Sequence, residues 1–276
     1  MFANYLIGLR EGLEAALIVS ILLAYVVRID KRQYLRPIWI GTFAAIGLAI
    51  GTGALLQVTS TSLDDRAQEI FAGVMSLAAV GLITWMIFWM AARARHIRAE
   101  LESGVDKALA GGSVTLGIMA FVAVIREGLE TALFLWTGIT STAGADATPA
   151  LAGAILGLSS AVVIGIGLYK GAISIDMRAM FRWSGIALVV VAAGVLTYAV
   201  REFQEVGWLP GEDLIAYDIT SVLPEDSAAA ALLRGFLNFR PTASWMVVGA
   251  WWLYLLPTMW LFLQRSGSKP KVAVNA

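Results

Sequence analysis

The sequence contains no cysteine and only one histidine, His96, in 276 residues. These absences exclude disulfide bonds, thiolate metal sites, cysteine nucleophiles and metal sites built from several histidines. A metal ion bound by this chain must therefore be held by oxygen ligands, above all by carboxylates. Charge is also scarce, since 14% of the residues are charged and a soluble domain carries about 25%. The formal net charge is zero, so the composition does not indicate binding to nucleic acid.

Long runs of apolar residues make up most of the sequence. Hydrophobic residues make up 59% of the chain, which indicates an integral membrane protein. A helix that crosses a bilayer needs about 20 mostly apolar residues, whereas a strand of a membrane barrel needs about 9–11. The runs have the length of helices, so we expect an all-α polytopic membrane protein with seven transmembrane helices. The predicted spans are residues 4–27, 37–57, 68–92, 114–138, 149–171, 181–200 and 244–263.

The connections between these spans differ in their content of basic residues. Fourteen Lys and Arg residues follow the first, third, fifth and seventh spans, and four lie in the opposite connections. Cytoplasmic loops carry the excess of Lys and Arg in membrane proteins. The sequence therefore predicts an outer N-terminus, an inner C-terminus and a place in the plasma (cytoplasmic) membrane.

One five-residue motif, R-E-G-L-E, occurs twice, at residues 10–14 and 126–130. Each copy puts three ionisable side chains inside an apolar run. At the centre of a spanning helix, each charge costs about 2.5–3.5 kcal/mol on the scale of translocon insertion. A chain that carries this cost twice in the same five letters is expected to use these residues in its function.

Helical geometry indicates how the motif is arranged. Glu11 and Glu14 are three residues apart and share a face, and Arg10 can pair with Glu14 four residues later. Gly12 and Gly128 leave room for a neighbouring helix to approach closely. The second copy repeats the arrangement with Arg126, Glu127 and Glu130.

Both copies are predicted to lie at a similar depth below the outer surface, so we expect them to face each other. Four carboxylates and two guanidiniums then share one site with an excess of negative charge, which suits a multivalent cation. The alternative is that the motifs form buried ion pairs that only fix helix packing, because buried pairs are weak evidence of a stabilising role. Repetition, with one surplus Glu in each copy, favours a functional site.

The seven spans divide into two triplets, residues 4–92 and 114–200, each of which begins with the motif helix. Because each triplet has an odd number of helices, the second triplet begins on the opposite side of the membrane from the first and has inverted topology. Such inverted repeats are common in transporters. We therefore expect one permease domain, 1–276, made of an inverted repeat of 3+3 helices and one extra C-terminal helix, 244–263. The outer acidic loop, 201–240, is predicted to contain two short amphipathic helices, the first ending at Pro224 and the second capped near Ser227. Its acidic residues indicate either a solvated connection or a vestibule that collects cations.

The paired motif in the first and fourth of seven helices, together with the letters E-I-F-A-G-V in the third, resembles the oxidase-dependent iron permease family. This family includes fungal high-affinity iron permeases and bacterial EfeU-type permeases, and the likeness covers essentially the whole chain. The resemblance implies iron import, with metal binding by Glu11, Glu14, Glu127 and Glu130 and support from Arg10 and Arg126. It also implies weaker candidates at Glu69, Glu205 and Asp218. Related sequences often carry a second acidic residue in the third helix, where this chain has Ala72 after Glu69.

The resemblance implies partners as well. Bacterial members work with an extracytoplasmic iron-binding protein and a haem peroxidase-like protein, and fungal members work with a multicopper ferroxidase. The expected function is a membrane permease for iron ions, which are substrate rather than a permanently bound cofactor, and not an enzyme. Only the resemblance implies iron, and Fe(III) is the expected ion. Fe(III) is a hard cation that suits an all-oxygen site, but Mn(II), Mg(II) and Ca(II) suit such a site too. Two alternatives remain open, namely a proton-coupled exchanger of another divalent cation and a non-transporting membrane subunit with structural ion pairs.

Overall fold

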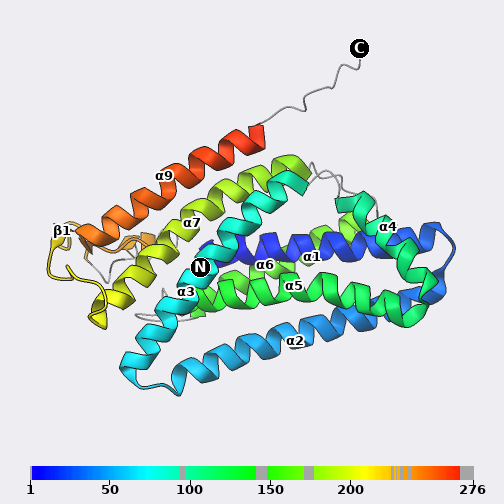
Figure 1. The fold of residues 1–276 in the computed structure, drawn as a ribbon, viewed down its shortest axis with the longest axis horizontal. Helices are drawn as coiled ribbons and strands as arrows, with labels where there is room; N and C mark the ends of the chain where they lie inside the picture. Colours follow the sequence, from blue (N-terminus) through cyan, green and yellow to red (C-terminus); the bar gives the residue numbers. More distant parts are fainter. Residues whose placement is uncertain are drawn as a thin grey trace, which may run out of the picture.

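The protein is an almost entirely helical bundle in a computed structural model (Figure 1). The structure describes residues 2–93, 97–140, 148–170, 177–224, 227, 229–230, 233–234 and 238–267. Long helices account for most of these residues, because apolar side chains surround them on all sides and their backbone polar groups are satisfied within each helix. The helices are α1 (Phe2–Arg28), α2 (Leu35–Thr61), α3 (Asp65–Arg93), α4 (Ile97–Ala110), α5 (Ser113–Thr140), α6 (Thr148–Tyr169), α7 (Met177–Glu205) and α9 (Trp245–Gly267).

Five of the described helices are long and apolar enough to cross a membrane: α2, α3, α6, α7 and α9. Helices α1 and α5 have similar lengths, 27 and 28 residues, but each carries one Arg and two Glu within its apolar run. The all-α membrane architecture expected from the sequence is therefore confirmed. The helix boundaries differ from the predicted spans by only a few residues at each end, mainly because the helices continue beyond the apolar runs.

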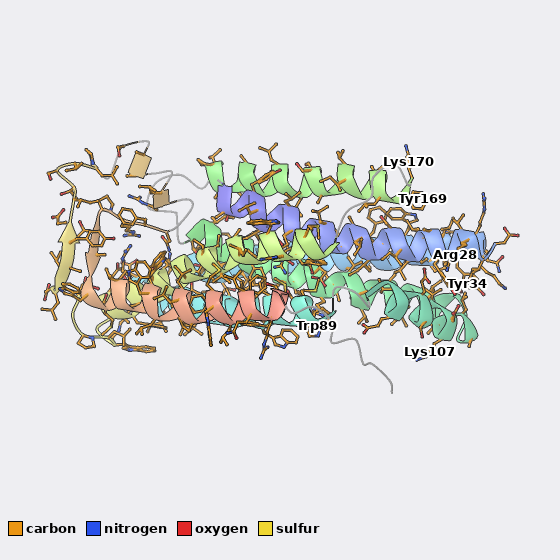
Figure 2. All side chains as sticks on the ribbon, turned by 90° about the horizontal axis from the view of Figure 1, so that it is seen from above. Arg28, Tyr34, Trp89, Lys107, Tyr169 and Lys170 are labelled. Atoms are coloured by element: carbon orange, nitrogen blue, oxygen red, sulfur yellow. The ribbon has the colours of Figure 1, made fainter. Side chains whose placement is uncertain are left out.

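The motif helices lie at the centre of the bundle and run antiparallel to each other (Figure 1). Helix α1 packs along α6, and α5 packs along α2. Helix α3 packs against α7, which in turn packs against α9. Arg28, Lys107 and Lys170 lie toward one end of the molecule, and the strand β1 (Ile215–Asp218) lies at the opposite end (Figure 2). Three of the fourteen basic residues that the sequence assigns to one side of the membrane therefore lie at the same end of the molecule.

Two glycines allow the backbones of neighbouring helices to approach closely. A Cβ atom added at Gly41 of α2 would lie next to the carbonyl oxygen of Gly117 in α5, and one added at Gly157 of α6 would meet the backbone of Tyr5 and Leu9 in α1. The interval between Gly41 and Gly157 equals the interval between the two motif copies. Small residues let helix backbones approach within a membrane, so both glycines are required for packing.

We expect Gly41→Ala to destabilise the bundle by about 1–3 kcal/mol, because the added methyl group overpacks a backbone contact. The matched control is Gly47→Ala on the same helix, where nothing lies within 4 Å of the added atom. This control should leave stability unchanged or raise it by up to about 1 kcal/mol, since alanine favours helix more than glycine does. The measurement is the thermal unfolding temperature in detergent, and equal temperatures for the two variants would refute the packing argument.

The outer loop differs from the prediction. Residues 215–218 form the strand β1, which pairs antiparallel with β2 (Thr242–Ser244), instead of the predicted amphipathic helix. The apolar residues at helical spacing were misleading because this segment finds hydrogen-bond partners in a strand close to the start of α9. The second predicted helix, from Ser227 onward, falls mostly on residues outside the described part of the chain.

Helix α4 was not predicted, because residues 97–110 are too polar for a membrane span. It is a 14-residue helix that buries Val105 and Ala108 against α1 and α5. Polar contacts hold it to the end of α1, where Arg28 pairs with Glu102 at 3.3 Å and the Tyr25 hydroxyl donates to Asp106 at 2.6 Å. Helix α4 thus covers the end of α1 and the start of α5.

Candidate metal centre

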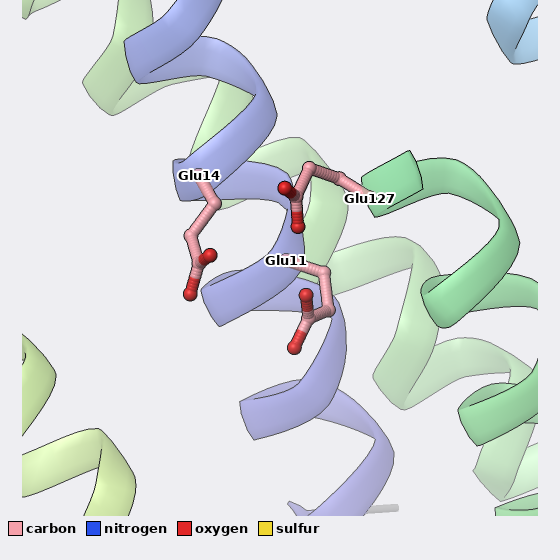
Figure 3. Close-up of side chains that lie close together, drawn as sticks. All are labelled: Glu11, Glu14 and Glu127. Atoms are coloured by element: carbon pink, nitrogen blue, oxygen red, sulfur yellow. The ribbon is translucent and has the colours of Figure 1, made fainter. Parts of the chain in front are cut away.

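The two motif copies meet where α1 and α5 pack together. One carboxylate oxygen from each of Glu11, Glu14 and Glu127 lies within 4.8 Å of the other two. Figure 3 shows that Glu11 and Glu14 come from successive turns of α1, while Glu127 reaches toward them from α5. This arrangement follows from the sequence, because residues three apart share a helix face and the antiparallel partner helix presents its own copy opposite. Such spacing is compatible with three ligands of a single ion.

All the motif carboxylates are buried. Glu11, Glu14, Glu127 and Glu130 are between 1% and 7% exposed. Glu130 lies one turn beyond Glu127 and interacts electrostatically with Glu14. It is not one of the three residues whose oxygens come together, so the structure gathers three of the four predicted ligands closely and places the fourth next to them.

The two arginines serve the site unequally. Arg10, itself 3% exposed, contacts Glu11 at 3.3 Å and Glu14 at 3.1 Å. Arg126 pairs with Glu130 at 3.1 Å and its side chain is about one-third exposed. One guanidinium therefore balances two carboxylates on α1, whereas the other balances a single carboxylate on α5. Glu127 is the carboxylate that neither of these ion pairs includes.

Glu11, Glu127 and Glu130 each have one buried carboxylate oxygen, Oε2, without a hydrogen-bond partner. Glu14 Oε1 also lacks a hydrogen bond, but it lies 3.1 Å from Nη2 of Arg10 in an ion pair. A buried polar atom without a partner costs about 1–3 kcal/mol, and more when it is charged. Buried charges in proteins are normally paired or bind metal ions. The donor set is therefore one that a hard cation would complete.

Helix α3 supplies contacts that the sequence analysis missed. The Arg10 guanidinium lies 3.7 Å from the sulfur of Met86. The Arg126 guanidinium lies 4.3 Å from the ring centre of Trp89 and 5.3 Å from that of Trp85. Trp85 is half exposed. Met86 and the two tryptophans position both arginines through sulfur and cation–π contacts.

The motif glycines have equivalent roles in the two copies. A Cβ atom on Gly12 would lie 2.7 Å from the Cβ of Ala161 in α6, and one on Gly128 would lie 2.7 Å from the Cβ of Ala49 in α2. The prediction that these glycines permit close helix approach is confirmed. Gly12 thus lets α6 pack closely against α1, and Gly128 lets α2 pack closely against α5.

Apolar side chains enclose the site along the bundle axis. Ile7 and Phe134, each one turn from a motif glutamate, belong to a buried cluster with residues of α3, α7 and α9. A second buried cluster contains Val19 and Val124 with residues of α2 and α4. These clusters lie on opposite sides of the glutamates along α1 and α5, and they pack buried apolar side chains there.

The three weaker candidates lie apart from this centre. Glu69, in the second turn of α3, interacts electrostatically with Glu205 at the end of α7. Asp218, at the end of β1, is exposed and accepts hydrogen bonds from the backbone N–H of Thr220 at 3.0 Å and from its hydroxyl at 2.7 Å. These bonds hold the pKa of Asp218 below its usual value. Asp218 therefore stabilises a turn, and none of the three joins the central cluster.

Comparison with known proteins identifies the family of the chain. The model of the iron permease FTR1 family matches residues 1–265. The chain is 38% identical over 266 residues to the ferrous iron permease EfeU of Escherichia coli O6:H1 (strain CFT073), covering 95% of each protein. It is 35% identical over 280 residues to the ferrous iron permease EfeU of Yersinia pestis, covering 100% of this chain and 98% of the relative. No solved structure matches. The chain belongs to the iron permease FTR1 family, and it is therefore an integral membrane transport protein rather than an enzyme.

Proposed function

We propose that this protein imports iron through the four-glutamate site between α1 and α5. The observation that carries the proposal is that Glu11, Glu127 and Glu130, from both motif copies, each have a buried carboxylate oxygen without a hydrogen-bond partner. Glu11, Glu14 and Glu127 place carboxylate oxygens within 4.8 Å of one another. A structural ion pair needs one carboxylate for each guanidinium, whereas this site has four carboxylates and two guanidiniums. The excess fits a multivalent cation better than it fits packing alone.

The arginines would set how tightly the ion is held. Arg10 partly neutralises Glu11 and Glu14, so that three carboxylates can approach without an ion present. An arriving cation would compete with the guanidinium for the same oxygens and would release them when it leaves. Ion release is necessary for transport, because a site that binds too tightly cannot conduct.

The seven-span plan and the inverted repeat are part of this proposal. Three features support the repeat: the two R-E-G-L-E copies, the matching pairs α1–α6 and α5–α2, and the equivalent close contacts of Gly41 and Gly157. Sites at the interface of such repeats allow each side to open in turn. The apolar clusters on either side of the glutamates would then act as alternating seals.

The orientation can be tested with single cysteines in this cysteine-free chain. We expect an impermeant thiol reagent on intact cells to label Ser62→Cys, which lies between α2 and α3, and to leave Ser103→Cys and Ser266→Cys unlabelled. The reason is that the basic connections belong to the cytoplasmic side. All three positions should react once the membrane is permeabilised, which controls for access. Labelling of position 103 in intact cells would reverse the orientation.

We also propose that the ion held at the site is Fe(III). A set of carboxylate ligands prefers hard cations. A trivalent cation is also attracted more strongly than a divalent one by the surplus negative charge of the site. The relatives carry the name ferrous iron permease, so Fe(II) is the competing outcome. By family resemblance, an extracytoplasmic iron-binding protein and a haem peroxidase-like protein would deliver the ion at the outer end, where Glu69 and Glu205 lie.

Uptake of radiolabelled iron into proteoliposomes distinguishes the oxidation states. We expect faster initial uptake of Fe(III) offered as a soluble chelate than of Fe(II) kept reduced by ascorbate, at equal free concentration. Manganese uptake and a pH-sensitive dye inside the vesicles serve as controls. Uptake of Fe(II) alone would overturn the Fe(III) proposal and keep iron import, whereas proton release driven equally by manganese would favour a general cation exchanger.

A further inference from the structure

A cavity at the β1 end of the molecule combines cationic and apolar walls. It has a volume of about 250 Å³ and lies between the last turns of α7, the strand region and the first turns of α9. Arg201, Arg240 and Asn238 contribute polar groups to it. The remaining lining residues are Thr197, Tyr217, Phe239, Ala243, Val247, Val248, Trp251 and Trp252.

The polar groups of the cavity have unused hydrogen-bonding capacity. Arg201 Nη1 and Arg240 Nε are buried nitrogens without a hydrogen-bond partner. Glu202 and Glu205 interact electrostatically with both Arg201 and Arg240, but the described lining of the cavity includes no carboxylate. Two guanidinium groups therefore face a largely apolar space, which is the arrangement that an anion with an apolar body would fill.

The position of the cavity matches the headgroup level of a bilayer. Arg201 lies one turn before the end of α7, and Trp251 and Trp252 lie in the second turn of α9. Tryptophan gathers at this level in membrane proteins. Trp252, Leu256 and Trp260, spaced four residues apart on α9, are all at least half exposed. They form an apolar stripe that starts at the mouth of the cavity and continues along the helix.

We propose that this cavity binds the phosphate headgroup of an anionic phospholipid, with an acyl chain lying along the stripe Trp252–Leu256–Trp260. The guanidiniums of Arg201 and Arg240 would pair with the phosphate, as basic pockets between membrane helices do. Bound lipid would tie α7 to α9 close to Phe203, which also packs against Gly73 of α3. This inference requires only that the chain spans a membrane and does not depend on the iron site.

Native mass spectrometry of the detergent-purified protein tests the proposal with defined lipids. We expect the wild type to retain dioleoyl phosphatidylglycerol in preference to dioleoyl phosphatidylcholine. The double variant Arg201→Gln, Arg240→Gln should lose this preference, and its adducts should fall to the phosphatidylcholine level. Arg265→Gln, at the opposite end of α9, is the matched control and should retain the wild-type preference.

A second variant separates lipid binding from a folding defect. Val248→Trp keeps both guanidiniums but fills the cavity, so it should lose phosphatidylglycerol while eluting as a monodisperse peak in gel filtration. Inorganic phosphate added in excess should not displace the lipid if the acyl chain contributes to binding. Wild-type phosphatidylglycerol adducts in both variants, equal retention of the two lipids by the wild type, or displacement of the lipid by phosphate would overturn the proposal.

Discussion

Replacing Glu127 by Gln is expected to reduce iron uptake per folded molecule by at least about tenfold. Loss of a residue that only supports a metal ligand already costs about 10–100-fold, so loss of a ligand should cost at least the lower of these values. Glu127 is buried, and one of its carboxylate oxygens lies within 4.8 Å of carboxylate oxygens of Glu11 and Glu14. The ion pairs of the motif arginines do not include Glu127. Gln keeps the shape of Glu and part of its hydrogen bonding but removes the charge that binds the cation. Because the change removes an unpaired buried charge, folding should be unharmed or improved.

The measurement is initial uptake of labelled iron into proteoliposomes, normalised to the yield of folded protein from gel filtration. Glu100→Gln, an exposed position on α4, is the matched control and should transport at the wild-type rate. Replacing both Glu11 and Glu14 should abolish uptake about as completely as replacing all four glutamates, because residues that act as a unit are not additive. Wild-type uptake by Glu127→Gln would exclude this residue from the ion pathway.

Arg10→Met is expected to have the largest effect on stability, with a loss of about 3–5 kcal/mol, the cost of leaving buried carboxylates without their partner. Arg10 contacts both Glu11 and Glu14 and is 3% exposed. Arg126→Met should cost clearly less, since Arg126 pairs with one carboxylate and is about one-third exposed. The measurements are the thermal unfolding temperature and the yield of folded protein in detergent.

A compensating variant distinguishes a transport site from structural ion pairs. Combining Arg10→Met with Glu11→Gln and Glu14→Gln removes the buried charges together, so the folded yield should recover toward the wild type. Iron uptake should stay absent, because two ligands are missing. If the motifs only fixed helix packing, the recovered triple variant would transport iron normally, and the proposed site would be wrong.

The sequence was sufficient for the positions of the long helices and for the arrangement of the motif glutamates. Apolar runs located the long helices, and the three-residue spacing of Glu11 and Glu14 placed both on one face of α1. The recurrence of the motif at residues 126–130 predicted that Glu127 would come from another helix to meet them. These features were predictable because helix period and membrane thickness restrict where a polar side chain can go.

Contacts between distant segments were not predictable in the same way. Met86 and Trp89 look like ordinary apolar residues of a membrane helix, and only the crossing of α3 beside the motif helices brings them to Arg10 and Arg126. The presence of Trp and Met on α3 would have been only a weak indication that this helix contacts the motif arginines. Helix α4 was missed because its composition is that of a polar loop, and its stability depends on burying Val105 and Ala108 against α1 and α5.

The unequal roles of the two arginines also required the structure. From the sequence, each Arg was expected to pair with the Glu four residues later, leaving Glu11 and Glu127 as equivalent surplus residues. Instead, Arg10 reaches both glutamates of its own copy, and the surplus is Glu127 alone. The two copies are identical in their letters, and the difference arises from their surroundings, with Met86 beside Arg10 and the Trp85–Trp89 pair beside Arg126.

The most direct test of the central claim is to locate the ion. Crystals of the purified protein loaded with iron, measured at the iron absorption edge, would give an anomalous difference map that marks iron atoms alone. We predict a peak between α1 and α5, surrounded by carboxylate oxygens of Glu11, Glu14 and Glu127, and no peak there in the Glu127→Gln variant at the same iron concentration. An iron peak bound elsewhere, with the space between these three glutamates empty, would contradict the account.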